Sequence, residues 1–189
     1  MVPTIPDYVT HYHLPDREPF LNLSELDEPA LADVLTELAA VPGSERRFGP
    51  RYMALRRATE ERLWARFVER GGRPERLSPH YFVLGESAWF RGLYADAREV
   101  RLRLEELPRE QTSFTVPDSV TSMGLLADFG IEVTPRAHHG EVFLLDELES
   151  VAARHGLPDS PSPEDYAGHQ HGDFEHYVEV QVWTDRIRK

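Results

Sequence analysis

The chain has 189 residues, of which 40 % are hydrophobic and 29 % are charged, and its formal net charge at pH 7 is −12. This length fits one domain that can bury a hydrophobic core, and the acidic balance argues against general binding to nucleic acid or anionic membranes. The absence of cysteine excludes disulfides, thiolate zinc sites and a cysteine nucleophile.

Two features of the sequence bear on its location and its charge. No apolar run reaches the roughly 20 residues that a membrane span needs, and residues 1–7 lack the basic and apolar regions of a signal peptide. We therefore expect a cytoplasmic protein. Residues 45–76 hold ten arginines and five glutamates, so this segment either binds phosphate or forms a solvated helix with alternating charges.

The first part of the chain is predicted to form one strand and two helices. Residues 8–14 read as a strand with His11 and His13 on one face. Apolar residues at helical spacing, with a polar cap before them, predict a helix over about 24–40. The same pattern predicts a second helix over about 50–70, which two glycines end.

Beyond residue 77 the sequence favours short strands. Alternating residues or short apolar runs bounded by turn residues predict strands over 80–84, 99–104, 112–116 and 140–145. A short helix is predicted over 146–156. Residues 157–173 are rich in Pro, Ser, Asp, Gly and His, and we expect a long loop there, of the kind that is usually functional or mobile.

The last predicted strand, within residues 174–185, has two different faces. Valines at 178, 180 and 182 alternate with Tyr177, Glu179, Gln181 and Trp183. The valine face is predicted to pack on the core. The opposite face places a carboxylate and a carboxamide between two aromatic rings, so we predict that Glu179 is the functional carboxylate. Its alternative is a solvent-facing strand residue.

These elements predict a single α+β domain over residues 1–189. Its helical part covers about 24–70, and a mostly antiparallel sheet follows over about 77–189. The chain contains no P-loop and no glycine fingerprint of a dinucleotide-binding fold.

One ordered set of short motifs extends over nearly the whole chain. Its members are His13, Asn22-Leu23, Arg51 or Arg47, Pro79-His-Tyr81-Phe82, Phe114-Thr115, Asp118, Leu145-Asp-Glu-Leu-Glu149 and Glu179. This order resembles that of the DarT-type DNA ADP-ribosyltransferases. Pro15 and residues 83–86 differ from the family pattern.

The resemblance implies a split, mostly antiparallel sheet that binds NAD as a substrate and transfers ADP-ribose to an acceptor. The acceptor would be a nucleic acid, a protein or a small molecule, and a DNA target would imply a macrodomain-type antitoxin as a partner. Glu179 and Arg51 would be catalytic, with Glu179 stabilising positive charge at the ribose and Arg51 holding the phosphates. The residues implied in binding NAD are His13, Asn22, Tyr81, Phe82 and Arg47.

Two other functions stay open. The nine histidines suggest a metal-dependent enzyme, in which His11 and His13 would act with histidines of the 157–173 loop. A non-catalytic module would bind a ligand on the same sheet. Each site residue also has a structural interpretation: Arg51 as a charge on a helix surface, Tyr81 as a core residue, and His13 as a partner of the backbone.

Overall fold

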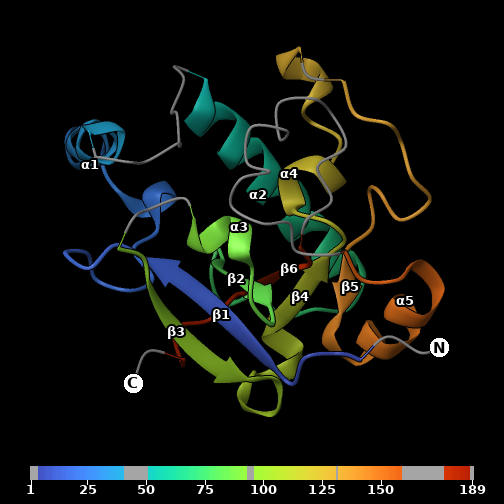
Figure 1. Cartoon of the computed structure of the whole chain (residues 1–189). Coiled ribbons are helices and arrows are strands. Elements are labelled where there is room, and N and C mark those ends of the chain that lie inside the picture. The colour runs from blue at the N-terminus through green and yellow to red at the C-terminus, as the bar shows by residue number, and fades with distance from the viewer. Residues whose placement is uncertain (1–3, 41–50, 93–95, 131, 159–176, 188–189) are drawn as a thin grey trace.

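The computed structural model describes residues 4–40, 51–92, 96–130, 132–158 and 177–187. Within these ranges the chain forms a six-stranded sheet and five α-helices (Figure 1). Every pair of neighbouring strands is antiparallel. The predictions of the α+β class and of a mostly antiparallel sheet are therefore confirmed.

The strands lie in the sheet in the order β3-β1-β2-β6-β4-β5. Their bounds are β1 Tyr8–His13, β2 His80–Leu84, β3 Arg98–Arg103, β4 Thr112–Thr115, β5 Phe143–Leu144 and β6 Glu179–Val182. The strand predicted over 140–145 is thus only two residues long. Strand β1 comes before the helical part of the chain and still belongs to the sheet, two positions from β6.

The α-helices are α1 Glu28–Ala40, α2 Tyr52–Glu69, α3 Ala88–Arg91, α4 Ser119–Ser122 and α5 Leu148–His155. Helices α1, α2 and α5 lie close to their predicted positions, whereas the four-residue helices α3 and α4 were not predicted. A 3₁₀ turn, η5 Leu145–Glu147, leads into α5. Most of the predicted 157–173 loop, like Arg47, lies outside the described residues.

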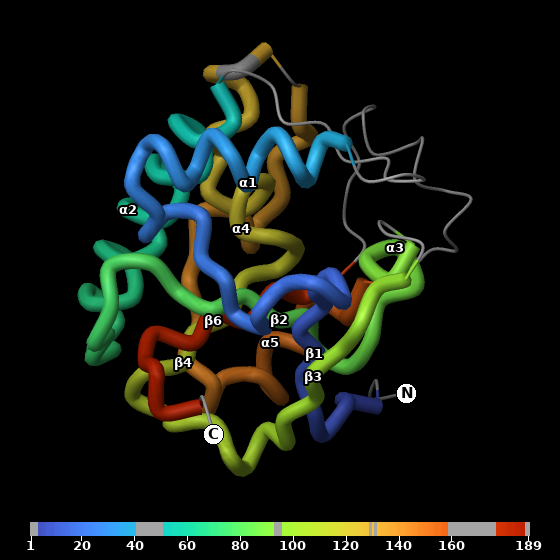
Figure 2. The backbone as a smooth tube through the Cα atoms, turned by 90° about the vertical axis from the view of Figure 1, so that its left-hand side faces the viewer, coloured from blue at the N-terminus to red at the C-terminus, as the bar shows by residue number. Residues whose placement is uncertain are grey.

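One side of the sheet packs against α5. The valines of β6 meet Phe82 of β2 and Phe114 of β4 there, together with Leu148 and Val151 of α5. This confirms the prediction that the valine face of the last strand is core. Figure 2 shows α5 on one side of the strands and α1, α2 and α4 on the other.

The other face of β6 is buried as well. Trp183 and Gln181 are 0 % exposed, and the Trp183 ring stacks on Phe67 of α2 with the centroids 5.9 Å apart. Glu179 is therefore not a solvent-facing strand residue, because β6 is an interior strand covered on both sides. Its two-residue alternation reflects two different buried environments, one apolar and one polar.

Strands β1 and β2 diverge along their length. They pair only at Val9 with Leu84 and at Thr10 with Val83, whereas β1 stays paired with β3 as far as His13. The His11 ring spans the gap, because its Nδ1 lies 2.9 Å from the Tyr81 carbonyl oxygen. This divergence opens the sheet from the side that faces α2.

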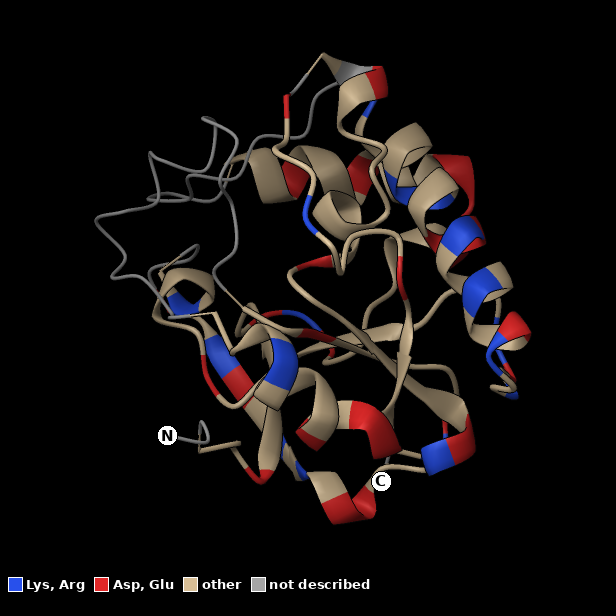
Figure 3. Ribbon diagram, turned by 90° about the vertical axis from the view of Figure 1, so that its right-hand side faces the viewer, with Lys and Arg blue, Asp and Glu red and all other residues tan. Residues whose placement is uncertain are grey.

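Basic and acidic residues are interspersed along the chain, as the ribbon in Figure 3 shows. In α2, Arg66 pairs with Glu69 at 3.1 Å and Arg57 with Glu28 at 3.5 Å. Of the two interpretations of the basic segment, a solvated helix with alternating charges fits these exposed pairs. None of the helices in the described ranges is long and apolar enough to span a membrane.

Candidate functional site

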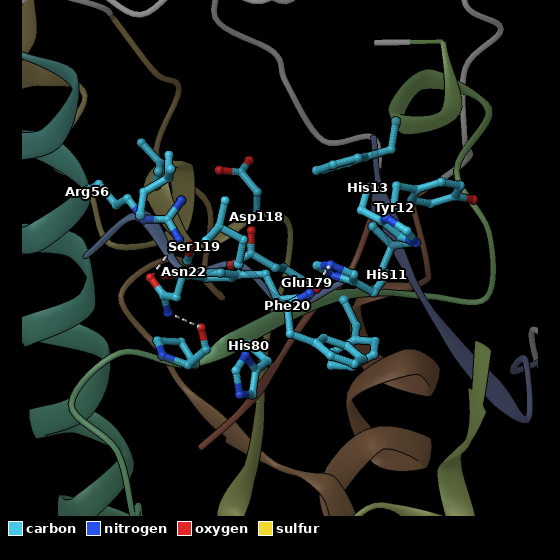
Figure 4. Close-up of a pocket in the computed structure, with 18 of the residues that line it drawn as sticks. His11, Tyr12, His13, Phe20, Asn22, Arg56, His80, Asp118, Ser119 and Glu179 are labelled. Carbon is cyan, nitrogen blue, oxygen red and sulfur yellow. Dashed lines mark hydrogen bonds between the residues drawn. The ribbon is translucent and has the colours of Figure 1, made fainter. Parts of the chain in front are cut away.

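A cavity of about 280 Å³ opens where β1 and β2 diverge. Its walls come from β1, β2, β6, α1, α2, α3, the segment before α1 and the start of α4. In Figure 4, Glu179 and Asp118 lie in the middle, Arg56 lies at one side, and Tyr12 and His13 lie at the other. The fold thus brings residues from distant parts of the chain to one hollow.

Glu179 is the central group of this cavity. Its side chain accepts a hydrogen bond from Gln181, with Nε2 3.1 Å from Oε1, and the residue is only 8 % exposed. Burial, followed by the negative charge of Asp118, raises the pKa of Glu179 to about 7, against hydrogen bonds from Ser119 and Gln181 and the charge of Arg56. Both protonation states of this carboxyl are therefore accessible near neutral pH.

A chain of hydrogen bonds fixes the orientation of Gln181. The indole Nε1 of Trp183 donates to Ser113 Oγ at 2.8 Å, and Ser113 Oγ donates to Gln181 Oε1 at 2.9 Å. Because the indole N–H can only donate, the Ser113 oxygen is its acceptor, and the Ser113 hydroxyl donates its own hydrogen bond to the carbonyl oxygen of Gln181. The amide N–H₂ of Gln181 is then left to face Glu179, so a buried network holds the carboxylate in place.

Asp118 supplies a second carboxylate. It is the N-cap of α4, where Oδ1 accepts a hydrogen bond from Thr121 N at 3.0 Å. Its Oδ2 is buried and has no hydrogen-bond partner within the described part of the chain. Burial raises the pKa of Asp118, although amides of the first turn of α4 lower it.

Arg56 lies at the polar end of the cavity in a network of its own. Its Nε is 3.1 Å from Glu60 Oε1, and its guanidinium carbon is 5.0 Å from the centroid of the Tyr81 ring. The Tyr81 hydroxyl donates a hydrogen bond to Glu60 Oε1 at 3.0 Å. Burial and the Glu60 charge raise the pKa of Tyr81 well above the ordinary value. Asn22 joins the network through Oδ1, 3.5 Å from Arg56 Nη2.

The opposite end of the cavity is aromatic. Tyr12 and Phe90 stack with their centroids 5.7 Å apart, and Tyr177 meets Phe90 edge-on at 5.4 Å. All three line the cavity. A flat ring can therefore enter at this end while charged groups of the same ligand reach Arg56.

The two histidines of β1 are held by the backbone. His11 Nδ1 contacts the Tyr81 carbonyl, and its Nε2 accepts from Phe20 N at 3.1 Å; burial lowers the pKa of His11 to about 4. His13 Nδ1 lies 2.9 Å from the Leu14 carbonyl oxygen and 3.2 Å from that of Arg17. Carbonyls only accept, so in its neutral form His13 keeps its lone pair on Nε2.

These contacts bear on the metal hypothesis. Both ring nitrogens of His11 are engaged, and a metal bond would require breaking one of these hydrogen bonds. Within the described ranges, no group of three or more His, Asp or Glu residues could hold a metal ion. The loop histidines of that hypothesis lie outside the described residues.

The cavity wall contains most of the predicted site residues: His13, Asn22, Tyr81, Phe82 and Glu179. Of these, Phe82 is 2 % exposed and belongs mainly to the core. Arg51 is exposed at the start of α2 and is not part of the wall. Arg56, five residues further along, lies on the inner side of α2 and forms part of the wall.

Arg56 and Asp118 were not predicted as site residues. Arg56 follows Tyr52 by four residues and precedes Thr59, both of which lie on the inward stripe of α2. Helical spacing alone could therefore have selected Arg56 over Arg51. Asp118 carried a turn signal in the sequence, but its burial depends on the packing of α4 against α2.

Comparison of the chain with protein-family models, with curated proteins and with solved structures finds no match. The geometry of the cavity is thus the basis on which a function can be argued.

Proposed function

We propose that this protein is an NAD-dependent ADP-ribosyltransferase in which Glu179 is the catalytic carboxylate. The observation that carries the proposal is a buried carboxylate, held by Gln181, at the centre of a ligand-sized cavity. Its pKa of about 7 is typical of groups tuned for acid–base work. Charge at one end of the cavity and aromatic rings at the other suit a nucleotide.

The chemistry assigns Glu179 two tasks. The bond from C1′ of the ribose to the nicotinamide nitrogen breaks, the electron pair leaves with nicotinamide, and positive charge develops on the ribose. An ionised Glu179 stabilises that charge. The acceptor then forms a bond to C1′ through its O–H or N–H group and gives up its proton to Glu179.

The size of the cavity limits what it can enclose. Ligand pockets usually measure roughly 300–1,000 Å³, and this one is about 280 Å³. We assign it to the nicotinamide–ribose end of NAD, with the adenosine end lying beyond the opening. The nicotinamide ring would stack on Tyr12, Phe90 or Tyr177 instead of Tyr81, whose ring faces Arg56.

The polar end of the cavity would hold the phosphates. Arg56 contacts Tyr52 Oη at 3.3 Å and Asn22 Oδ1 at 3.5 Å through its two terminal nitrogens. Both contacts are long for hydrogen bonds, so these N–H groups can turn towards a phosphate oxygen. His13, whose Nε2 is an acceptor when neutral, would take a hydrogen bond from a ribose hydroxyl.

The test combines binding with turnover. We expect NAD at 100 times its dissociation constant to stabilise the wild type by about 2.7 kcal/mol, measured by thermal unfolding, and nicotinamide to be released. Glu179→Gln keeps the shape of the side chain and should bind NAD while releasing nicotinamide at least 100-fold more slowly. Exposed Glu149 provides the matched control, Glu149→Gln, which should behave as the wild type.

Three outcomes separate the candidate functions. A wild type that millimolar NAD does not stabilise contradicts the proposal. Binding without any release or transfer, and with equal affinity in Glu179→Gln, identifies a non-catalytic binding module. Turnover that chelators abolish identifies a metal-dependent enzyme.

A further inference from the structure

Asp118 presents an acceptor that the described protein groups leave unused. Its Oδ1 serves α4 as the cap, whereas Oδ2 is buried and without a hydrogen-bond partner among the described residues. The residue is 5 % exposed and forms part of the cavity wall. Buried polar atoms without a partner are rare in native proteins, and each one calls for an explanation.

The donors around Asp118 act on its carboxyl without closing a hydrogen bond to Oδ2. The amides of Val120 and Thr121 and the Thr121 hydroxyl lower its pKa by hydrogen bonding, and Thr121 N is bound to Oδ1, whereas Oδ2 has no hydrogen-bond partner among the described residues. The side chain of Ser119 hydrogen-bonds to Glu179. Thr115 is paired with Glu179 across the sheet, and Asp118 lies three residues after Thr115. Oδ2 of Asp118 therefore lies next to the Glu179 carboxylate, which in the proposed reaction stabilises positive charge on the ribose.

We propose that Asp118 is a specificity-determining residue whose Oδ2 accepts a hydrogen bond from a neutral N–H or O–H donor of the bound ligand. The identity of that ligand rests on the proposed function. In NAD two donors lie near the scissile bond, the carboxamide of nicotinamide and the hydroxyls of its ribose. A ligand with a carboxylate at the same place would be rejected by Asp118 and Glu179.

Asp118→Asn tests this assignment without removing the cap. Asparagine caps helices as well as aspartate does, so Oδ1 keeps its bond to Thr121 N and an N–H₂ group replaces Oδ2. The ligand-free variant should unfold at the wild-type temperature or above it, and its affinity for NAD should fall at least tenfold. Asp27 provides the matched control, because it accepts a hydrogen bond from Ala30 N at 3.0 Å on an exposed helix end; Asp27→Asn should leave NAD affinity unchanged.

The choice of probe distinguishes the two donors. If Asp118→Asn weakens binding of NAD but not of ADP-ribose, the donor is the carboxamide, and the variant should also gain affinity for the deamidated form of NAD. If it weakens NAD and ADP-ribose equally, the donor is a ribose hydroxyl. Unchanged affinity for both probes overturns the proposal and leaves Asp118 as a cap only.

Failure of the proposed function would look different. In that case the wild type itself would respond to neither NAD nor ADP-ribose. The ligand-free measurement still decides whether Oδ2 is unused, because an Asp118→Asn variant that unfolds well below the wild type would show that this oxygen already has a donor within the protein. That result overturns the inference for any ligand.

Discussion

Gln181 Nε2 lies 3.1 Å from Glu179 Oε1, and both side chains project from the same face of β6. Residues two apart on a strand share a face, so this contact follows directly from the alternation of the last strand. Trp183 and Ser113 orient the Gln181 amide and so make Gln181 the donor in this hydrogen bond. The carboxylate at the centre of the cavity is thus held by a network that begins in the core under α2.

Replacing Gln181 by Leu should disturb both stability and the carboxylate. The change leaves the Ser113 hydroxyl and a carboxylate oxygen of Glu179 without their buried partner, at a cost of about 1–3 kcal/mol. It also removes a hydrogen bond that lowers the pKa of Glu179, so the acidic limb of nicotinamide release should move to higher pH. Urea unfolding and a pH–rate profile measure the two effects.

Trp183→Phe serves as the comparison for Gln181→Leu. It removes the indole donor but keeps a ring against Phe67. The Ser113 hydroxyl can still donate to Gln181 Oε1, which keeps the Gln181 amide turned towards Glu179. We expect the pH profile to stay close to that of the wild type. A profile that Gln181→Leu fails to move would show that Gln181 does not tune the carboxylate, whereas a profile that Trp183→Phe moves as far would show that the indole is needed to orient Gln181.

Glu179 should make the protein less stable as the pH rises. Its pKa is about 7 in the folded state against an ordinary value of 4.5, so the native state binds the extra proton between these values. The stabilising contribution is complete below pH 4.5 and is lost as the pH rises through 7. Glu179→Gln lacks this loss, and its free energy of unfolding should exceed that of the wild type by about 3 kcal/mol at pH 8.5 and much less at pH 4.5. Denaturant unfolding at both pH values checks this; a difference independent of pH would contradict it.

The sequence predicts the strands and the three longer helices because each of these has a local signal, whereas the four-residue helices α3 and α4 were not predicted. The alternation in β3, the inward stripe of α2 and the valines of β6 are readable without knowledge of the fold. The burial of the polar face of β6 is not readable, because Gln181 and Trp183 would show the same alternation on an open sheet. It depends on α2 packing over that face, which no short stretch of the sequence encodes.

The candidate site shows the same division. Asn22, Tyr81 and Glu179 were selected from the sequence and lie together on the cavity wall. Arg51 matched the order of motifs but lies outside the cavity wall, whereas Arg56 lies on the helical face that lines it. The cavity itself could not be predicted, since it exists only where β1 and β2 diverge.

Arg56 and Arg51 should respond very differently to substitution. Arg51→Ala changes an exposed residue and should alter stability by less than about 0.5 kcal/mol, with NAD affinity unchanged. Arg56→Ala leaves Glu60, which is 3 % exposed, as a buried charge without its cation, at a cost of about 3–5 kcal/mol. Thermal unfolding with and without NAD measures both variants.

A double variant separates stability from binding at this position. Arg56→Gln combined with Glu60→Gln removes the ion pair without leaving either charge alone, so the fold should survive. Loss of NAD stabilisation in this variant supports Arg56 as the phosphate ligand. Wild-type affinity would assign it a structural role only.

His11 should remain neutral over most of the accessible pH range. Its ring lies between the Tyr81 carbonyl and Phe20 N, which fixes the tautomer protonated at Nδ1, and nitrogen-detected NMR should show this tautomer down to about the pKa of 4. Because the folded pKa lies below the ordinary 6.5, the native state loses stability as the pH falls from 6.5 through 4. The contribution of His11 to the pH dependence of stability has the opposite sign to that of Glu179. The two contributions are therefore separated only by comparing variants at each position.

The same geometry predicts how the protein responds to metals. Zn²⁺ at His11 would break a backbone hydrogen bond of a buried ring. His11→Asn should therefore leave unchanged the response of the unfolding temperature to added Zn²⁺ or a chelator, measured on protein without a histidine tag. His13 serves as the comparison with His11, because the backbone holds the His13 ring through Nδ1 alone. A chelator-sensitive unfolding temperature that His11→Asn abolishes would require His11 to leave its backbone partners, and would favour the metal-dependent enzyme over the transferase.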